Sequence, residues 1–148
     1  MRVLGIDLGS KRIGIALSDT AGTMATPYEV VPRSGDRQRD HRRIADLAEE
    51  AGAEALVVGL PLSLDGSVGR AATGALAEAA ELEAATGLPV ETWDERLTTV
   101  TADRDLMALD MKADARRRVV DKVAASVMLQ AWLDHRRLTA REDAPPDD

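Results

Sequence analysis

Three acidic positions stand out because each interrupts or follows a segment that should otherwise be buried. Asp7 places a carboxylate inside the apolar run Val3–Leu8. Glu95, with Asp94 beside it, follows directly on a predicted strand, and Asp121 lies beside the apolar stripe of a predicted helix. Burying an unpaired carboxylate costs on the order of several kcal/mol, so a buried acid requires a cation or strong hydrogen bonds. These positions are therefore candidates for chemistry.

Carboxylates that converge at one edge of a sheet would form a site for one or two divalent cations. The ligands must be oxygen atoms, because the chain has no Cys and its two His residues, His41 and His135, are far apart in the sequence. Oxygen ligands favour Mg²⁺ or Mn²⁺. Two such ions about 4 Å apart activate a water and stabilise the leaving oxygen in phosphodiester cleavage. The acids Asp7, Glu95 and Asp121 are thus predicted as metal ligands and catalytic residues of a nuclease.

Each acid also has a purely structural explanation. Asp7 could be an exposed residue beside a hairpin. Asp94 could cap the helix that is predicted to follow it, which is one reason to prefer the longer Glu95 as the ligand. Asp121 could pair with Arg117 or Arg118 at helical spacing on a solvated face. The residue types alone leave these alternatives open.

Further residues near the acids could contact nucleic acid. Lys11 and Arg12 follow Gly9 in a predicted hairpin, where small residues let a phosphate approach the backbone. The loop Gly59–Ser67 leads into a helix N-terminus, which favours anions, although its Asp–Gly pair is also an ordinary turn signal. Trp93 could stack on a base or pack in the core, and core packing is the commoner role for Trp.

The composition is that of a soluble globular domain. The chain has 148 residues, enough to bury one core, and no apolar run reaches the roughly 18–20 residues of a membrane span. Its formal net charge of −7 is unusual for a nucleic-acid protein. The basic residues are nevertheless grouped, in one set at Arg33, Arg37, Arg39, Arg42 and Arg43 and in another at Lys112, Arg116, Arg117, Arg118 and Lys122.

The hydrophobic pattern predicts the elements that position these residues. Apolar runs at 3–8, 12–17 and 26–31, with no helix between them, predict an antiparallel meander. A helix–strand–helix–strand unit follows, with strands at 55–60 and 90–93. Terminal helices are predicted at 98–109 and 113–137.

Together these elements predict an α/β fold with a mixed five-stranded sheet flanked by helices. The right-handed crossover rule places the fourth and fifth strands parallel to the first. We expect one nuclease domain over residues 1–137. Residues 138–148, with two prolines among acidic side chains, are expected to form a flexible acidic tail.

Four sequence blocks resemble one known family. They are G-I-D-L-G-S-K-R-I-G-I-A at Gly5–Ala16, V-V-G-L-P-L-S-L-D-G-S at Val57–Ser67, D-E-R-L-T-T at Asp94–Thr99 and D-K-V-A-A at Asp121–Ala125. In this order they are similar to the YqgF family, which is described as pre-16S rRNA nucleases and as Holliday junction resolvase-like proteins related to RuvC. The blocks span nearly the whole chain, so the match is specific.

The resemblance implies an RNase H-like fold, Mg²⁺ or Mn²⁺ as cofactor, and processing of the 5′ end of pre-16S rRNA in the bacterial cytoplasm. The family's acidic motif positions fall on Asp7, Glu95 and Asp121, and its basic positions on Arg12 and Arg96. The implied partners are pre-rRNA and ribosome assembly intermediates, or branched DNA, with no membrane involved. The chain would act as a monomer or a homodimer.

Three other functions compete with rRNA processing. Resolution of four-way DNA junctions would use the same chemistry but requires two symmetric cuts and hence a dimer. An actin-like ATPase is suggested by the G-I-D-L-G-S block, but such enzymes need two domains of this kind. A non-enzymatic RNA-binding factor would not require the three acids.

Overall fold

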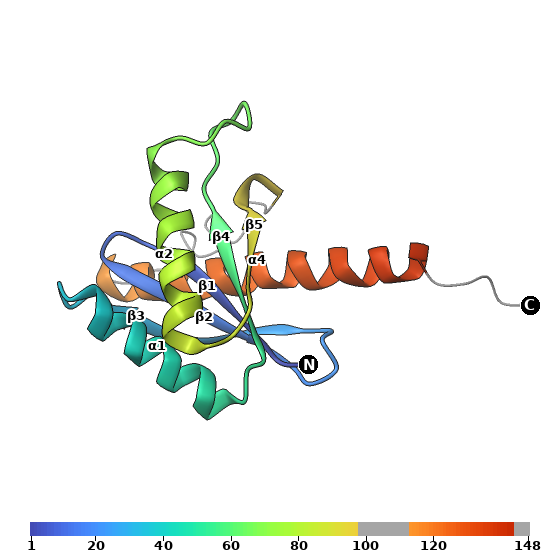
Figure 1. Ribbon diagram of the computed structural model, residues 1–148, viewed down its shortest axis with the longest axis horizontal. Helices are drawn as coiled ribbons and strands as arrows, with labels where there is room; N and C mark the ends of the chain where they lie inside the picture. Colours follow the sequence, from blue (N-terminus) through green and yellow to red (C-terminus); the bar gives the residue numbers. More distant parts are fainter. Residues whose placement is uncertain (98–112, 144–148) are drawn as a thin grey trace, which may run out of the picture.

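The computed structural model describes residues 1–97 and 113–143, and the side chains of the last helix over residues 123–139. The chain forms a sheet with helices on both faces (Figure 1). The helix predicted at 98–109 lies outside the described residues.

The sheet has the predicted five strands in the order β3-β2-β1-β4-β5. Strand β1 pairs antiparallel with β2 and parallel with β4, and β4 pairs parallel with β5. The meander and the two parallel crossovers are thus confirmed, and β1 lies at the centre of the sheet. The strands span Val3–Leu8 (β1), Arg12–Ser18 (β2), Ala25–Pro32 (β3), Ala55–Leu60 (β4) and Val90–Asp94 (β5).

Three long helices are described: α1 (Arg37–Ala51), α2 (Arg70–Thr86) and α4 (Ala113–Asp143). Helix α1 begins after Asp36, whose side chain accepts hydrogen bonds from two backbone N–H groups of the first turn, and ends at Gly52 in a left-handed conformation. Helix α4 is longer than predicted, because it continues to Asp143. The expected boundary of the tail after residue 137 is therefore wrong for residues 138–143, which are helical.

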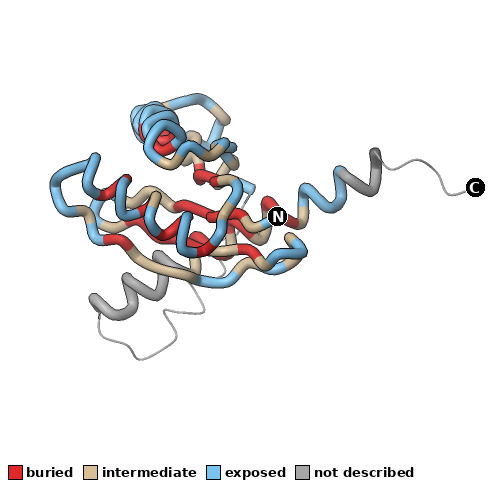
Figure 2. Tube along the Cα trace, turned by 60° about the horizontal axis from the view of Figure 1, so that its bottom comes forward, coloured by how far each residue is buried: buried red, intermediate tan, exposed pale blue. Residues whose placement is uncertain are grey.

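Side-chain alternation along the strands gives the sheet two buried faces. Leu4 and Ile6 of β1 belong to a core that also contains residues of α1 and α2. Val3 and Val57 belong to a second core that contains the buried face of α4. Figure 2 shows buried residues following the strands and the helix faces turned toward them.

Helix α4 lies unusually close to the central strand. A methyl group at Gly5 would be 2.8 Å from Cβ of Leu129, closer than real Cβ contacts allow. Ala125, one turn earlier, is fully buried. Gly5 in β1 and the small Ala125 in α4 allow the helix to lie this close to the strand. No described helix combines the length and apolar character needed to cross a membrane.

Candidate active site

Asp7 lies near the carboxyl end of β1, between β2 and β4. It pairs in register with Gly14 of β2, and Ile6 before it pairs with Val58 of β4. Because side chains alternate along a strand, Asp7 shares a face with Val3 and Gly5, the face that α4 covers. This acid is therefore half-buried inside the central strand rather than exposed beside the hairpin.

Glu95 reaches Asp7 across the neighbouring strand. It is the first residue after β5, at the start of a short 3-10 helix, Glu95–Leu97. Gly59 of β4 pairs with Trp93 of β5, so it lies between the two acids. A Cβ atom at Gly59 would overlap the Glu95 carboxylate oxygen Oε1. The missing side chain makes room for Glu95, whose side chain hydrogen-bonds that of Asp7.

The setting of Glu95 favours its protonated form. Burial, the negative charge of Asp7 and the hydrogen bond between the two side chains together raise the pKa of Glu95 to about 7, with a smaller contribution from Asp94. A hydrogen bond between two carboxyl groups needs a proton. A divalent cation held by oxygen atoms could replace that proton and neutralise both charges, so the donor set fits Mg²⁺ or Mn²⁺.

Asp94 and Arg96 form a second charged pair at the same end of the sheet. The Arg96 guanidinium donates to both Asp94 oxygens, from Nε to Oδ1 at 3.0 Å and from Nη2 to Oδ2 at 2.7 Å. Hydrogen bonds from Arg96 hold the pKa of Asp94 below its ordinary value. Asp94 also accepts from the Arg96 backbone N–H and so caps the short 3-10 helix Glu95–Leu97. The helix that the sequence predicted Asp94 to cap lies outside the described residues.

Arg96 connects the acid site to the loop before α2. Its Nη1 donates to the Leu64 carbonyl oxygen at 3.3 Å, and Gly66 lies close to the same guanidinium. Gly66 has φ +87°, a conformation that glycine adopts without strain. Arg96 thus organises the loop after β4. Of its five N–H donors, two bind Asp94 and one binds the Leu64 carbonyl.

Asp121 lies in α4, one turn before the buried Ala125. Its side chain is outside the part of the chain described in atomic detail, so its predicted meeting with Asp7 and Glu95 stays a prediction. Among the described side chains, no group of three acids or histidines is close enough to hold a metal ion. The described site therefore consists of two of the three predicted acids.

The remaining predicted contacts surround the first hairpin. Lys11 is exposed at its tip and Arg12 begins β2. Gly9 is required here, because a Cβ atom would overlap the Arg12 carbonyl oxygen. The turn is closed by a hydrogen bond from the Gly9 N–H to the Asp7 carbonyl at 3.1 Å, so the hairpin is tied directly to the catalytic candidate.

Trp93 has the structural role that the sequence offered as an alternative to base stacking. It is half-buried, packs against the α4 core, and its ring lies 5.5 Å from that of His135 in a tilted arrangement. This position favours the packed alternative.

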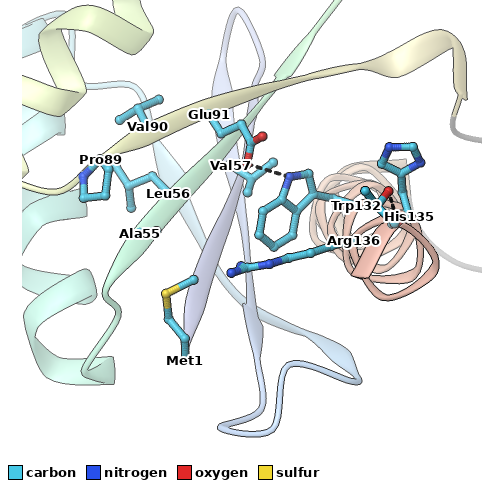
Figure 3. A pocket seen from close by; sticks show the side chains of 11 residues that line it. Met1, Ala55, Leu56, Val57, Pro89, Val90, Glu91, Trp132, His135 and Arg136 are labelled. Atoms are coloured by element: carbon cyan, nitrogen blue, oxygen red, sulfur yellow. Dashed lines mark hydrogen bonds between the residues drawn. The ribbon is translucent and has the colours of Figure 1, made fainter. Parts of the chain in front are cut away.

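A cavity of about 650 Å³ lies at the other end of the parallel strands (Figure 3). Its walls come from the beginnings of β4 and β5 and from α4, where Trp132 donates from Nε1 to Glu91 at 2.9 Å. The Arg136 guanidinium lies 5.2 Å from the centre of the Trp132 ring. Because this cavity opens at the start of β4 and β5, whereas Glu95 follows the end of β5, it is separate from the acid site.

Sequence reasoning missed two features of the site. Gly59 was assigned to an anion-binding loop, although a glycine inside an apolar strand signals close approach by another group. The other is a buried network in which Glu78 of α2 binds Arg33 and His41. Nothing local in the sequence marks Glu78 as buried, since it sits in an alanine-rich helix with other acids.

Comparison with known proteins agrees with this geometry. The family described as "RuvX: Holliday junction resolvase" matches residues 1–135. A protein of Rhodococcus opacus (strain B4) named "Putative pre-16S rRNA nuclease" is 50% identical over 139 residues, covering 91% of this chain and 78% of the relative. One of the same name from Leifsonia xyli subsp. xyli is 46% identical over 97% of this chain and 92% of the relative.

Solved structures confirm the fold. Thermus thermophilus RuvC superposes with a TM-score of 0.55 at 17% identity, covering 94% of this chain and 98% of that one. The same enzyme in complex with a Holliday junction substrate gives a TM-score of 0.52 at 16% identity, covering 91% and 96%. This likeness shows the RNase H-like fold predicted from the sequence. Together with the sequence match over nearly its whole length, it establishes that the chain belongs to the RuvX family.

Proposed function

We propose that this chain is a nuclease that depends on Mg²⁺ or Mn²⁺ and processes the 5′ end of pre-16S rRNA in the cytoplasm. The observation that carries the proposal is the contact between Asp7 and Glu95, with a pKa raised to about 7 at Glu95. Two partly buried acids held together at one end of the sheet are costly unless a cation or a shared proton joins them. The names of the relatives supply the substrate.

The residues of the chain have separate roles in this proposal. Asp7 and Glu95 would hold the metal, with Asp121 as a third ligand from α4. Bound divalent metal activates water and stabilises the leaving oxygen of a phosphodiester. Lys11, Arg12 and Arg96 would contact phosphates of the substrate, and Asp94 orients the Arg96 guanidinium through two hydrogen bonds.

The test compares wild type with Asp7→Asn on a labelled rRNA precursor, a single-stranded RNA and a four-way DNA junction, in Mg²⁺ and in Mn²⁺. The variant should lose cleavage while its circular dichroism spectrum and its RNA affinity stay close to those of wild type. Equal cleavage by the two proteins would remove the catalytic assignment.

Resolution of four-way junctions is the second candidate, favoured by the family description and by the RuvC fold. It requires two active sites related by symmetry, and therefore a stable dimer. Light scattering at working concentrations together with the junction assay separates the two functions. A monomer that cuts only the rRNA precursor excludes the resolvase.

A further inference from the structure

A second cavity, with a volume of about 450 Å³, lies beside the hairpin that follows Asp7. It is formed between the β1–β2 turn and the segment that joins β3 to α1, which lie together at the left of Figure 1. Its walls are Ser10, Lys11, Arg33, Gly35, Arg37 and Asp40. Most of the side chains that reach this cavity are therefore charged or polar.

Arg33 is held rigidly at the back of the cavity. Its two terminal nitrogens donate to the two carboxylate oxygens of Glu78, each at 2.9 Å, and its Nε donates to the Gly9 carbonyl at 2.8 Å. The Glu78 side chain is only 7% exposed and also contacts His41 at 2.7 Å. Each terminal nitrogen of Arg33 keeps a second N–H, so a fixed guanidinium has donors left for an anion.

Arg37 is held much more loosely. Its Nε lies 2.7 Å from Glu81, and the two side chains are 46% and 52% exposed. The same Nε lies 3.8 Å from the buried carboxylate of Glu78, which is a weaker second ion pair. The exposed ion pair with Glu81 contributes little to stability, so an incoming anion can displace the Glu81 carboxylate. Lys11 is exposed at the hairpin tip on the other wall.

The charges of the walls select an anionic ligand. Three cations face the cavity, and the single carboxylate in the wall, Asp40, is buried and accepts from the Ser34 backbone N–H. The cavity also lies within reach of the acid site. Ser10 is three residues from Asp7, so their Cα atoms are at most about 11 Å apart. A strand bound at the acids that continues over the β1–β2 turn would bring one of its next phosphates to this cavity.

We propose that this cavity binds a backbone phosphate adjacent to the scissile one, through Arg33, Arg37 and Lys11. The inference rests on the proposed nuclease function and assigns to Arg33 and Arg37 a positioning role that the acid site does not require. The ligand is a phosphodiester, which RNA and DNA share, so the cavity itself does not discriminate between them.

The first test measures binding in the Asp7→Asn background, using a fluorescent single-stranded RNA and a fluorescent four-way DNA junction as probes. Arg37→Gln should weaken binding by about threefold to tenfold and reduce the slope of log K against log salt by about 0.7–0.9. Arg43→Gln is the matched control, because it removes the same charge from an exposed position of α1 outside the cavity.

The second test uses a substitution that should tighten binding of the probes instead of weakening it. Glu81→Gln should tighten binding by about twofold to fivefold, because it removes the nearer of the two carboxylates that pair with Arg37. Glu83→Gln removes an equal charge from an exposed position on the same helix that does not contact Arg37. The phosphates near the cut can also be replaced one at a time by neutral methylphosphonates. At one position this replacement should weaken binding to the protein that has Arg37 but leave binding to Arg37→Gln unchanged.

The outcomes separate this inference from the proposed function. If wild type cleaves and Asp7→Asn does not, but Arg37→Gln behaves like Arg43→Gln, the cavity is not a phosphate site while the nuclease proposal stands. The phosphate site is likewise excluded if Glu81→Gln and Glu83→Gln bind alike. If neither probe binds any variant and wild type cleaves none of the substrates, both proposals fail.

Discussion

Replacing Glu95 by Gln should stabilise the metal-free protein at neutral pH, although it removes a proposed metal ligand. Burial and the charge of Asp7 raise the pKa of Glu95 from 4.5 to about 7. The folded state therefore binds this proton more tightly than the unfolded chain does, and wild type loses stability as pH rises from about 4.5 to about 7. A Gln side chain carries no charge and avoids this loss.

The size of the effect follows from the difference between the two pKa values. A rise from 4.5 to about 7, at 1.36 kcal/mol for each pH unit, sets an upper bound of about 3 kcal/mol. Glu95 is only partly buried, so solvent screening reduces the expected gain to about 1.5 kcal/mol. In a chain of this length, that corresponds to a rise of about 3–6 °C in Tm at pH 8, with almost none at pH 4.

The assay is urea and thermal unfolding followed by circular dichroism, in EDTA and in excess Mg²⁺, across this pH range. In Mg²⁺ the order should reverse, because a ligand that binds only the folded state stabilises wild type more than the variant. Glu83→Gln, which removes an exposed carboxylate far from Asp7 in sequence, controls for general charge effects. A Glu95→Gln protein that is less stable than wild type at pH 8 in EDTA would refute the reasoning.

Three further substitutions test the packing around the site. Gly59→Ala should displace the Glu95 carboxylate, because the new methyl group would overlap Oε1. The rise in Tm that Mg²⁺ produces should therefore be smaller in this variant than in wild type. An equal rise in the two proteins would show that Gly59 is not needed for metal binding. Gly5→Ala should cost about 1–3 kcal/mol of unfolding free energy, because the new methyl would lie 2.8 Å from Leu129, and Leu129→Ala should restore part of it in urea titrations. Glu78→Gln should cost about 2–3 kcal/mol at pH 7, because it leaves a partly buried guanidinium unpaired. Burial alone would raise the pKa of Glu78, but its hydrogen bonds hold that pKa below its ordinary value. The difference in unfolding free energy between wild type and Glu78→Gln should therefore fade as the pH falls below the ordinary carboxyl pKa of 4.5. A difference that is constant from pH 7 to pH 2 would contradict the ion-pair account.

Two residues of the candidate site, Asp7 and Glu95, were predictable because each has a conspicuous local setting. A carboxylate inside an apolar strand marks Asp7, and an acid directly after a strand marks Glu95. Both signals are local in sequence, and the crossover rule then brings the two strand ends to the same edge of the sheet. Asp121, the third predicted acid, lies in the predicted helix, and its convergence with the other two acids stays a prediction.

The sequence by itself determined the order of strands and helices, the two buried faces of the sheet and the candidate acids, because periodicity, turns and strand ends are encoded over a few neighbouring residues. Only the tertiary structure decided that Gly59 makes room for Glu95 and that Glu78 binds Arg33 at the side of the hairpin. These contacts join residues that are far apart along the chain. A pattern within one segment cannot report which distant side chain arrives beside it, since that depends on how helices and strands pack.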